Sequence, residues 1–325
     1  MGLSENKVFR PDGKDFEERA LDLFRFQVQH NPVYQQYTDT LGFDPGSVQA
    51  ITQIPFLPIG FFKTHSIRTT AFTPAAVFES SGTTRTGNSH HDIKDLTLYE
   101  RSFTAGFEKF YGQPRDWCII GLLPSYLERS GSSLVVMTDE LIRMSGHPDS
   151  GFYLHEHDKL YTTLRRLEDR RQKTLLIGVT FALLDFAEEH SMDLRHTVVM
   201  ETGGMKGRRK EMIRAELHEF LMRRLGLPAI HAEYGMTELL SQAWSHGQGL
   251  FEPVPWMKVL VRSEDDPFEI GKEGSGILNI IDLANIYSCS FLATEDTGKV
   301  YAGGQFEVSG RVDNSDIRGC SLLVI

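Results

Sequence analysis

The 325-residue sequence has few cysteines, no long basic run and no long apolar run. Its cysteines, Cys118, Cys289 and Cys320, are odd in number and far apart, which fits neither a disulfide framework nor a zinc site and favours a reducing cytoplasm. The formal net charge is −10 and no basic run exceeds residues 208–210, so a nucleic-acid partner is not indicated. Without a bilayer-length apolar run or an apolar signal region, we expect a soluble cytoplasmic protein.

The composition that is present, 40% hydrophobic and 24% charged, is that of a globular chain with one large domain or about two smaller ones. Apolar runs typical of strands occur at residues 117–123, 174–179 and 197–201. Helical patterns occur at residues 15–29, 92–111, 132–144, 158–171, 181–190 and 208–225. Their alternation predicts a mainly parallel sheet covered by helices. Beyond about residue 247, short strands at 256–261, 276–282, 288–293 and 305–310 predict a smaller β-rich subdomain.

A loop rich in glycine and hydroxyl residues occupies residues 79–91 (ESSGTTRTGNSHH). Its backbone N–H groups, hydroxyls and the Arg85 guanidinium could all face one anion, as a polyphosphate requires. It follows the apolar run 75–78 and precedes the helical pattern 92–111, so we expect it where an α/β sheet binds its ligand. The spacing excludes a P-loop, because Asn88 stands where that motif requires lysine. A solvated surface loop has the same composition.

Two predicted strand ends carry further chemistry. Gly203 and Gly204 follow the strand at 197–201 and would allow a flat ligand to approach the backbone. The second strand end is residues 230–238 (IHAEYGMTE), in which Tyr234 could pack on a base, Thr237 could meet a phosphate and Glu238 could hold Mg²⁺. A strand-to-helix turn and a capped helix start explain the same residues.

Several polar residues have simpler explanations when each is taken alone. Asp282, Asp296 and Arg311 lie at or just after predicted strands, where each could be a turn or surface residue. His90 and His91 lack the spacing of metal ligands, although a histidine beside phosphates could be cationic. The order of the motifs is therefore more informative than any single member.

Four motifs carry a resemblance to a known family: residues 80–84 (SSGTT), 234–238 (YGMTE), 294–296 (TED) and 310–313 (GRVD). In this order they resemble the core motifs of the adenylate-forming (acyl-AMP) superfamily. Residues 55–63, 201–208 and 317–320 look more narrowly like the acyl-protein synthetases, the LuxE-type branch, with phenylacetate–CoA ligases as relatives. The likeness covers nearly the whole chain and is weakest between residues 128 and 175.

The resemblance implies an α/β fold like the N-terminal domain of adenylate-forming enzymes, with mostly parallel sheets covered by helices and a smaller β-rich subdomain. It implies an α/β nucleotide-binding core with an N-terminal helical segment at residues 1–246, the β-rich subdomain at 247–312, and a tail at 313–325. The mobile C-terminal domain of the family is expected to be absent, and Lys206 or Lys63 would replace the lysine that this domain supplies.

The implied activity is the ATP- and Mg²⁺-dependent conversion of a carboxylic acid, a fatty acid in this branch, to acyl-AMP, followed by transfer to a protein cysteine. The residues implied to bind ATP or AMP are Ser80, Ser81, Gly82, Thr83, Thr84, Gly87, Gly203, Gly204, Tyr234, Gly235, Asp296 and Arg311. Cys320, Thr237, Glu238 and Arg85 would be catalytic, with Cys320 accepting the acyl group and Glu238 also binding Mg²⁺. As a residue of a last strand, Cys320 could instead be a small apolar side chain.

The partners expected from this resemblance are the carboxylic acid and a reductase or carrier protein that consumes the thioester, with no nucleic acid and no membrane span. Two other functions stay open. An acyl- or aryl-CoA ligase would release its product to CoA and would not need Cys320. A non-catalytic nucleotide-binding subunit of a complex would show no carboxylate-dependent chemistry at all.

Overall fold

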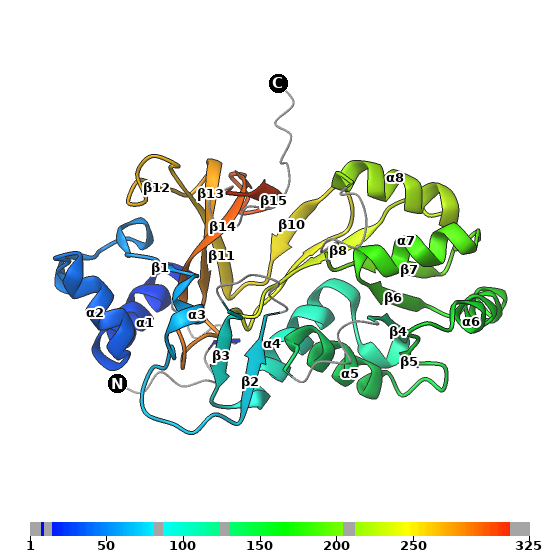
Figure 1. Ribbon diagram of the computed structural model, residues 1–325, viewed down its shortest axis with the longest axis horizontal. Helices are drawn as coiled ribbons and strands as arrows, with labels where there is room; N and C mark the ends of the chain where they lie inside the picture. Colours follow the sequence, from blue (N-terminus) through cyan, green and yellow to red (C-terminus); the bar gives the residue numbers. More distant parts are fainter. Residues whose placement is uncertain (1–7, 10–14, 81–86, 124–130, 204–211, 313–325) are drawn as a thin grey trace. The chain divides into compact units, whose positions relative to one another are not determined.

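The structure is a computed structural model that describes residues 8–9, 15–80, 87–123, 131–203 and 212–312 (Figure 1). Its helices are α1 (Phe16–His30), α2 (Pro32–Thr40), α3 (Phe61–Thr64), α4 (Leu96–Tyr111), α5 (Ser133–Ser145), α6 (His157–Asp169), α7 (Thr180–Glu189) and α8 (Arg214–Leu225). Its strands are β1 (Leu57–Pro58), β2 (Ala76–Glu79), β3 (His90–Ile93), β4 (Cys118–Leu122), β5 (Gly151–Phe152), β6 (Thr174–Gly178), β7 (Thr197–Glu201), β8 (His231–Tyr234), β9 (Ala243–Ser245), β10 (Leu250–Pro253), β11 (Met257–Arg262), β12 (Ile270–Gly271), β13 (Gly274–Asp282), β14 (Phe291–Val300) and β15 (Phe306–Arg311). Within these described ranges, no helix is both long and apolar enough to cross a membrane.

Contacts group the chain into two compact units that interleave along the sequence. Unit 1 contains Met1–Ser102, Met236–Gln242 and Glu252–Ile325, and unit 2 contains Phe103–Gly235 and Ala243–Phe251. The N-terminal helices therefore share a unit with the C-terminal strands. The functional division at residues 1–246, 247–312 and 313–325 stays a prediction.

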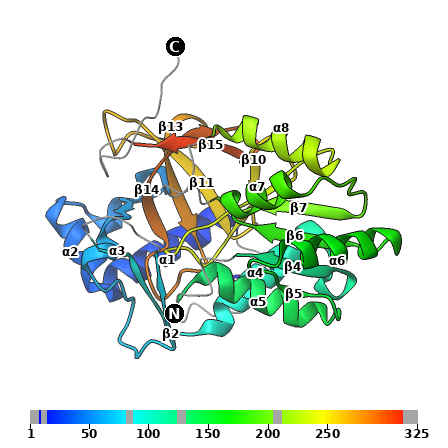
Figure 2. The same cartoon turned by 45° about the vertical axis from the view of Figure 1, so that its right-hand side comes forward.

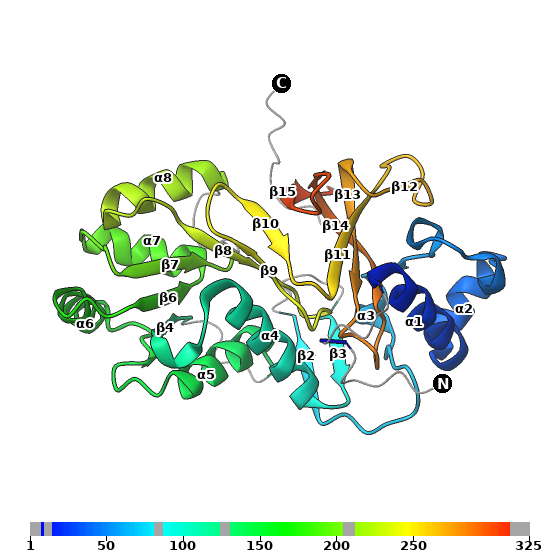
Figure 3. The ribbon, with the colours of Figure 1, turned by 180° about the vertical axis from the view of Figure 1, so that it is seen from behind.

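Unit 2 is built on a sheet with the strand order β9-β8-β7-β6-β4-β5, in which only β9 runs antiparallel to its neighbour. Every residue of β4 and β6 is buried, as expected for parallel strands covered on both faces. Helices α7 and α8 lie on one side of β6 and β7, and α5 lies on the other (Figures 1 and 3). The parallel sheet expected from the alternating pattern is confirmed.

Helices α5 and α8 of unit 2 have capping residues that stabilise their ends. The side chain of Ser132 accepts a hydrogen bond from the Val135 N–H and caps the start of α5. Gly146 and Gly226 end α5 and α8 in the left-handed conformation, with φ of 62° and 64°, which glycine adopts without strain. These caps fix where α5 begins and where the connections that follow α5 and α8 begin.

Unit 1 contains an antiparallel sheet with the strand order β12-β11-β13-β14-β15, and β1 adds to β14 in parallel (Figures 1 and 2). The predicted β-rich texture beyond residue 247 corresponds to these strands, although β14 begins at Phe291 and extends to Val300, later than the sequence pattern indicated. Strands β13 and β14 have few exposed residues and carry the core of the unit.

Within unit 1, the buried side-chain amide of Gln27 joins helix α1 to the turn between β13 and β14. The Gln27 Nε2 group donates to the carbonyls of Asn285 at 2.9 Å and Ile286 at 3.0 Å, and the Gln27 side-chain oxygen accepts from the Ser290 N–H at 2.9 Å. The ring of Phe24 meets that of Phe291 edge-on at 5.9 Å. The NH₂ group and the oxygen of this amide are both hydrogen-bonded, so the fully buried side chain leaves no polar group unpaired.

The surroundings of the glycine-rich loop differ from the sequence expectation. The loop was expected between a strand and a helix, but it joins β2 to β3, which pair antiparallel from Ala76 to Ile93. The helical pattern predicted from residue 92 begins only at Leu96, because His90–Ile93 completes this strand pair. The Asp95 side chain then accepts from the Thr97 N–H at 2.9 Å and marks the helix start.

Candidate functional site

The backbone of the Thr237–Glu238 segment is held by side chains from other parts of unit 1. His91 on β3 donates from Nδ1 to the carbonyl oxygen of Thr237 at 2.8 Å. Asn285, which follows β13, donates from Nδ2 to the carbonyl oxygen of Glu238 at 2.7 Å. Both side chains are fully buried or nearly so, which fixes the segment in one position.

Asp282 anchors the residues that follow this segment. Its Oδ2 accepts from the N–H groups of Leu240 at 2.8 Å and Ser241 at 3.0 Å, and its Oδ1 accepts from the Ser241 hydroxyl and the Ala284 N–H. Burial raises the pKa of Asp282 to about 6, although all of these hydrogen bonds oppose the rise. The expectation of a turn or surface residue is therefore wrong, because the carboxylate is buried to serve four donors.

His91 is neutral rather than cationic. Its side chain is 1% exposed, and this burial lowers its pKa to about 4, against the opposing effects of the Thr237 carbonyl and Asp92. The sequence expectation of a cationic histidine is wrong for this residue. His90, its neighbour on the opposite face of β3, is half-exposed and lies 3.5 Å from Glu79.

Glu238 lies within electrostatic reach of two other predicted site residues. Its side chain is 6% exposed, and burial raises its pKa, while a hydrogen bond with the Ser89 hydroxyl and the charge of Arg311 oppose the rise and Asp296 adds to it. Ser89 is tied to the loop base, since its N–H donates to the Ser80 hydroxyl at 2.9 Å. The structure thus brings Glu238, Asp296 and Arg311 together in unit 1.

Asp296 and Arg311 stand opposite each other on β14 and β15. The Arg311 Nε donates to Asp296 Oδ1 at 2.9 Å, and the Asp296 N–H donates to the Thr294 hydroxyl at 3.1 Å. The Asp296 side chain is 8% exposed, whereas that of Arg311 is 70% exposed. A carboxylate steadied by an accessible guanidinium is a suitable pair for hydrogen bonds to ligand hydroxyls.

In unit 2, Gly203 and Tyr234 lie at the carboxyl ends of neighbouring parallel strands. Strands β7 and β8 pair with Glu201 opposite Ala232, so both residues reach the same edge of the sheet. Open α/β sheets bind ligands at this edge. The Gly203 φ is 76°, which favours glycine, and the Tyr234 ring packs against Phe251 with centroids 5.8 Å apart.

Glu201 organises this strand end. Its Oε1 accepts from the Thr180 hydroxyl at 2.8 Å and the Gly203 N–H at 2.9 Å, and its Oε2 lies 3.6 Å from His218 and 3.9 Å from Arg214. Burial alone would raise the pKa of Glu201, but His218, Arg214 and Thr180 together hold it below its usual value. An ionised carboxylate therefore fixes the Gly203 backbone.

Glu233 on β8 behaves in the opposite way. Burial raises its pKa to about 8, and the charge of Glu201 adds to the rise. At neutral pH this side chain is therefore mainly a protonated acid, which can donate one hydrogen bond and accept others. Two carboxyl groups at one sheet edge thus hold different protonation states.

Sequence reasoning did not predict the roles of five residues that shape these sites: Ser89, His91, Asn285, Asp282 and Glu201. Ser89 and His91 alternate along the strand that includes β3, and recognising a strand there would have placed both on one face. Glu201 ends a predicted strand, which is the usual position of ligand-site residues. Nothing in the local sequence marks Asn285, because its partners lie far away along the chain.

Several predicted site residues fall outside the described residues, and their roles stay predictions: Ser81, Gly82, Thr83, Thr84, Arg85, Gly204 and Cys320, with Lys206 as the predicted lysine substitute. Of the other loop residues, Ser80 pairs with Ser89 through its backbone N–H at 3.0 Å, and Gly87 has φ of 90°. Gly235 is exposed after β8.

Comparison with known proteins gives the fold. No family model and no curated protein sequence matches the chain. Among solved structures, ATP-bound MatB from Rhodopseudomonas palustris matches 75% of this chain and 49% of its own, at 19% identity and a TM-score of 0.54. O-succinylbenzoate coenzyme A synthetase from Bacillus subtilis matches 75% of this chain at 17% identity, with 63% of its own chain and a TM-score of 0.50 in the AMP complex. For the complex of the same synthetase with ATP and magnesium ion, the match covers 75% of this chain and 51% of the synthetase chain, at 17% identity and a TM-score of 0.51.

The chain therefore spans about half to three-fifths of the length of these structures. At such identities the likeness shows the fold alone, and it confirms that the chain has the predicted α/β fold, which it shares with these structures.

Proposed function

We propose that the chain uses ATP to convert a carboxylic acid into an acyl adenylate and then passes the acyl group to a thiol. The observation that carries this proposal is the buried Glu238, which is hydrogen-bonded to Ser89 and lies within electrostatic reach of the Asp296–Arg311 pair. Glu238, Asp296 and Arg311 come from three separate motifs. Likeness in fold to structures solved with ATP or AMP supports a nucleotide as the ligand.

The chemistry explains why such groups are needed. A carboxylate is a poor electrophile, because its charge repels nucleophiles and oxide is a very poor leaving group. Joining it to AMP removes both obstacles, but the two reacting groups are anions and must be brought together. Fixed donors and a cation in a site that excludes water offset this repulsion most effectively.

Glu238 fits a magnesium ion that is shared with the substrate. Mg²⁺ is usually held by one or two carboxylates together with phosphate oxygens and water. Among the residues that the structure describes, no three His, Cys, Asp or Glu side chains gather into a metal site, which agrees with an ion that takes most ligands from ATP. When bound, the ion would offset the charge of the phosphates.

The chain's own groups would divide the remaining work. Tyr234 would pack on the adenine and the Gly203 backbone would border it. Asp296 and Arg311 would bind the ribose hydroxyls, and Thr237 would contact the α-phosphate. The loop at residues 80–87 would hold the pyrophosphate end, with Arg85 among its donors.

For the acceptor, we propose Cys320 as the nucleophile that forms an acyl thioester, with a reductase or carrier protein consuming it. An intact-mass increase of one acyl group after incubation with a fatty acid and MgATP would support this, and Cys320→Ser should abolish it. Undiminished labelling of Cys320→Ser would contradict the role. CoA-dependent product release in the same variant would instead assign an acyl- or aryl-CoA ligase. The likeness in fold to a coenzyme A synthetase also favours CoA as the acceptor.

The activation step is tested by carboxylate-dependent ATP–pyrophosphate exchange over short, long and aromatic acids. Glu238→Gln should lower the exchange rate by ~10²–10³, the usual loss for one preorganised catalytic group. Glu264→Gln changes an exposed glutamate of the same unit and serves as the matched control. If no acid supports exchange, the chain is a nucleotide-binding subunit without this catalysis.

A further inference from the structure

Side chains from other parts of unit 1 hold Glu238 at three points. The Ser89 hydroxyl forms a hydrogen bond with the Glu238 carboxylate. His91 donates from Nδ1 to the carbonyl oxygen of Thr237 at 2.8 Å, and Asn285 donates from Nδ2 to the carbonyl oxygen of Glu238 at 2.7 Å. The main chain and the side chain of Glu238 are therefore both restrained.

Two of these three contacts come from one face of a single strand. Ser89 directly precedes β3, and its carbonyl accepts from the Ser80 N–H at 3.0 Å, which continues the pairing of β2 with β3 by one residue. Residues two apart in an extended strand point to the same side, so Ser89 and His91 share a face. Both side chains are buried, at 3% and 1% exposure. The same strand face thus contacts the carboxylate of Glu238 and the carbonyl before it.

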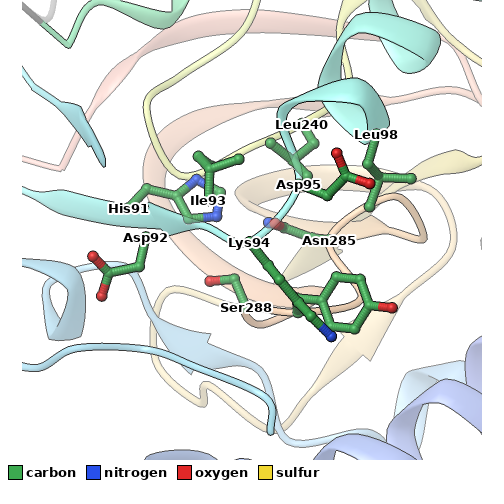
Figure 4. A pocket seen from close by; sticks show the side chains of 10 residues that line it. His91, Asp92, Ile93, Lys94, Asp95, Leu98, Leu240, Asn285 and Ser288 are labelled. Carbon is green, nitrogen blue, oxygen red and sulfur yellow. The ribbon is translucent and has the colours of Figure 1, made fainter. Parts of the chain in front are cut away.

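His91 and Asn285 are themselves held in place. They are hydrogen-bonded to each other and line the same small pocket, which His91 reaches from β3 and Asn285 from the turn after β13 (Figure 4). Phe62 meets the His91 ring edge-on, with centroids 5.6 Å apart. The Asn285 carbonyl accepts from Gln27 at 2.9 Å, and the Asn285 N–H donates to the Asp282 carbonyl at 3.1 Å. These contacts give the two donors, and the carbonyls that they bind, defined positions.

Ser89 also connects Glu238 to the base of the glycine-rich loop. The Ser89 N–H donates to the Ser80 hydroxyl at 2.9 Å. In the function proposed above, the loop at residues 80–87 holds the pyrophosphate end of ATP, and Glu238 holds the Mg²⁺ that the phosphates share. One serine therefore links the two parts of the site that a complex of Mg²⁺ with ATP would contact.

Ser89 and His91 both carry polar atoms into a buried position. Burying a hydroxyl or an imidazole costs free energy unless the group forms hydrogen bonds, and an apolar side chain of similar size would fill the same space without that cost. The hydrogen bonds that offset this cost include those to the Glu238 carboxylate and to the Thr237 carbonyl. The polar character of the two residues therefore serves the position of this segment, in addition to the packing of unit 1.

We propose that Ser89 and His91 are positioning residues, which place the Glu238 carboxylate for a magnesium ion bound together with ATP. This inference rests on the function proposed above and adds two residues to it. Carboxylates that bind metal ions are themselves hydrogen-bonded, and removing a residue that orients a metal ligand usually lowers metal affinity or activity about 10–100-fold. Ser89 orients the carboxylate directly, whereas His91 acts through the Thr237 carbonyl and is supported by Asn285.

Calorimetric titration of the full chain with ATP, once with excess Mg²⁺ and once with EDTA, tests this inference without any catalysis. Ser89→Ala should weaken the binding of MgATP about 10–100-fold and should leave the binding of metal-free ATP unchanged, because only the metal-bound form uses the Glu238 carboxylate. Ser275→Ala changes an exposed serine of β13 and is the matched control. It should bind both forms of ATP as the wild type does.

Two variants of His91 separate positioning from packing. His91→Asn keeps an N–H donor where Nδ1 now lies, whereas His91→Leu keeps none. Both variants lose the ring that packs against Phe62, so both should have lower thermal midpoints than the wild type. Only His91→Leu should also weaken MgATP binding, by about 3–10-fold, which corresponds to one hydrogen bond.

The outcomes distinguish this inference from the proposed function. MgATP binding by Ser89→Ala that equals the wild type, or an equal loss with Mg²⁺ and with EDTA, would overturn the positioning role. Equal MgATP affinities of His91→Asn and His91→Leu would overturn it for His91. A wild type that binds MgATP but supports no carboxylate-dependent exchange would refute the acyl-adenylate function alone. A wild type that binds MgATP no better than metal-free ATP would refute this inference as well.

Discussion

Replacing Asp282 by asparagine should destabilise the protein, and more strongly in acid than at neutral pH. Asparagine has one acceptor oxygen where aspartate has two, so its NH₂ group must face two of the donors that Asp282 now serves. Leaving these buried N–H or O–H groups unpaired costs about 1–3 kcal/mol each. This penalty is present at any pH.

The pH dependence comes from the raised pKa of Asp282, about 6 in the folded protein against an ordinary 3.8. A carboxyl group with a raised pKa binds its proton more tightly when folded, so its contribution is fully present below pH 3.8 and is lost as the pH rises through 6. At about 1.4 kcal/mol per pH unit the total is about 3 kcal/mol, of which about half falls between pH 5 and pH 7.5. Asparagine does not titrate and therefore lacks this loss.

Urea unfolding of wild type and Asp282→Asn at pH 5.0 and pH 7.5 measures the difference. The destabilisation should be larger at pH 5.0 by about 1.4 kcal/mol, because other titrating groups cancel in the comparison. Asp265→Asn, an exposed aspartate of the same unit, should show no such difference. Equal destabilisation by Asp282→Asn at both pH values would refute a buried, proton-binding Asp282.

Three further predictions concern unit 2. Thr180→Val removes the hydroxyl that donates to Glu201 and should lower stability by about 1–3 kcal/mol in urea unfolding, with a larger effect than Thr180→Ser. Because the pKa of Glu233 is raised in the folded protein, the wild type should lose stability as the pH rises through about 8, and Glu233→Gln should abolish this loss. If the thermal midpoints of both proteins change equally from pH 7 to pH 9, the prediction is wrong. Gly203→Ala should lower the free energy of unfolding by about 1 kcal/mol, because an alanine is strained at a φ of 76°, whereas Gly303→Ala should not. Equal unfolding midpoints of these two variants would refute the strain at Gly203.

The sequence predicted the regular parts of this fold because their patterns are local. Continuous apolar runs indicated β4, β6 and β7, and the spacing of apolar residues indicated the helices beside them. The start of α4 was misjudged, since residues 92–93 fit a helical pattern but pair with β2 instead. Tertiary pairing decided between two structures that the local pattern allowed.

The candidate site was predicted less completely, for a physical reason. Glu238, Asp296 and Arg311 belong to motifs and could be named from the sequence. His91, Asp282 and Asn285 act through hydrogen bonds to backbone groups 42 to 146 residues away, which no local pattern records. Their burial also reverses what their residue types suggest, since His91 is neutral and Asp282 is not at the surface.

The buried amide of Gln27 has a consequence for how the protein folds during synthesis. Its partner Ser290 is synthesised 263 residues later, so the docking site of α1 becomes available only roughly 13–50 s after α1 itself at ordinary synthesis rates. The strands of unit 2 from β4 to β8 emerge as one continuous stretch in the meantime and can assemble first. Nascent chains halted before residue 285 should therefore expose α1 to proteases and chaperones.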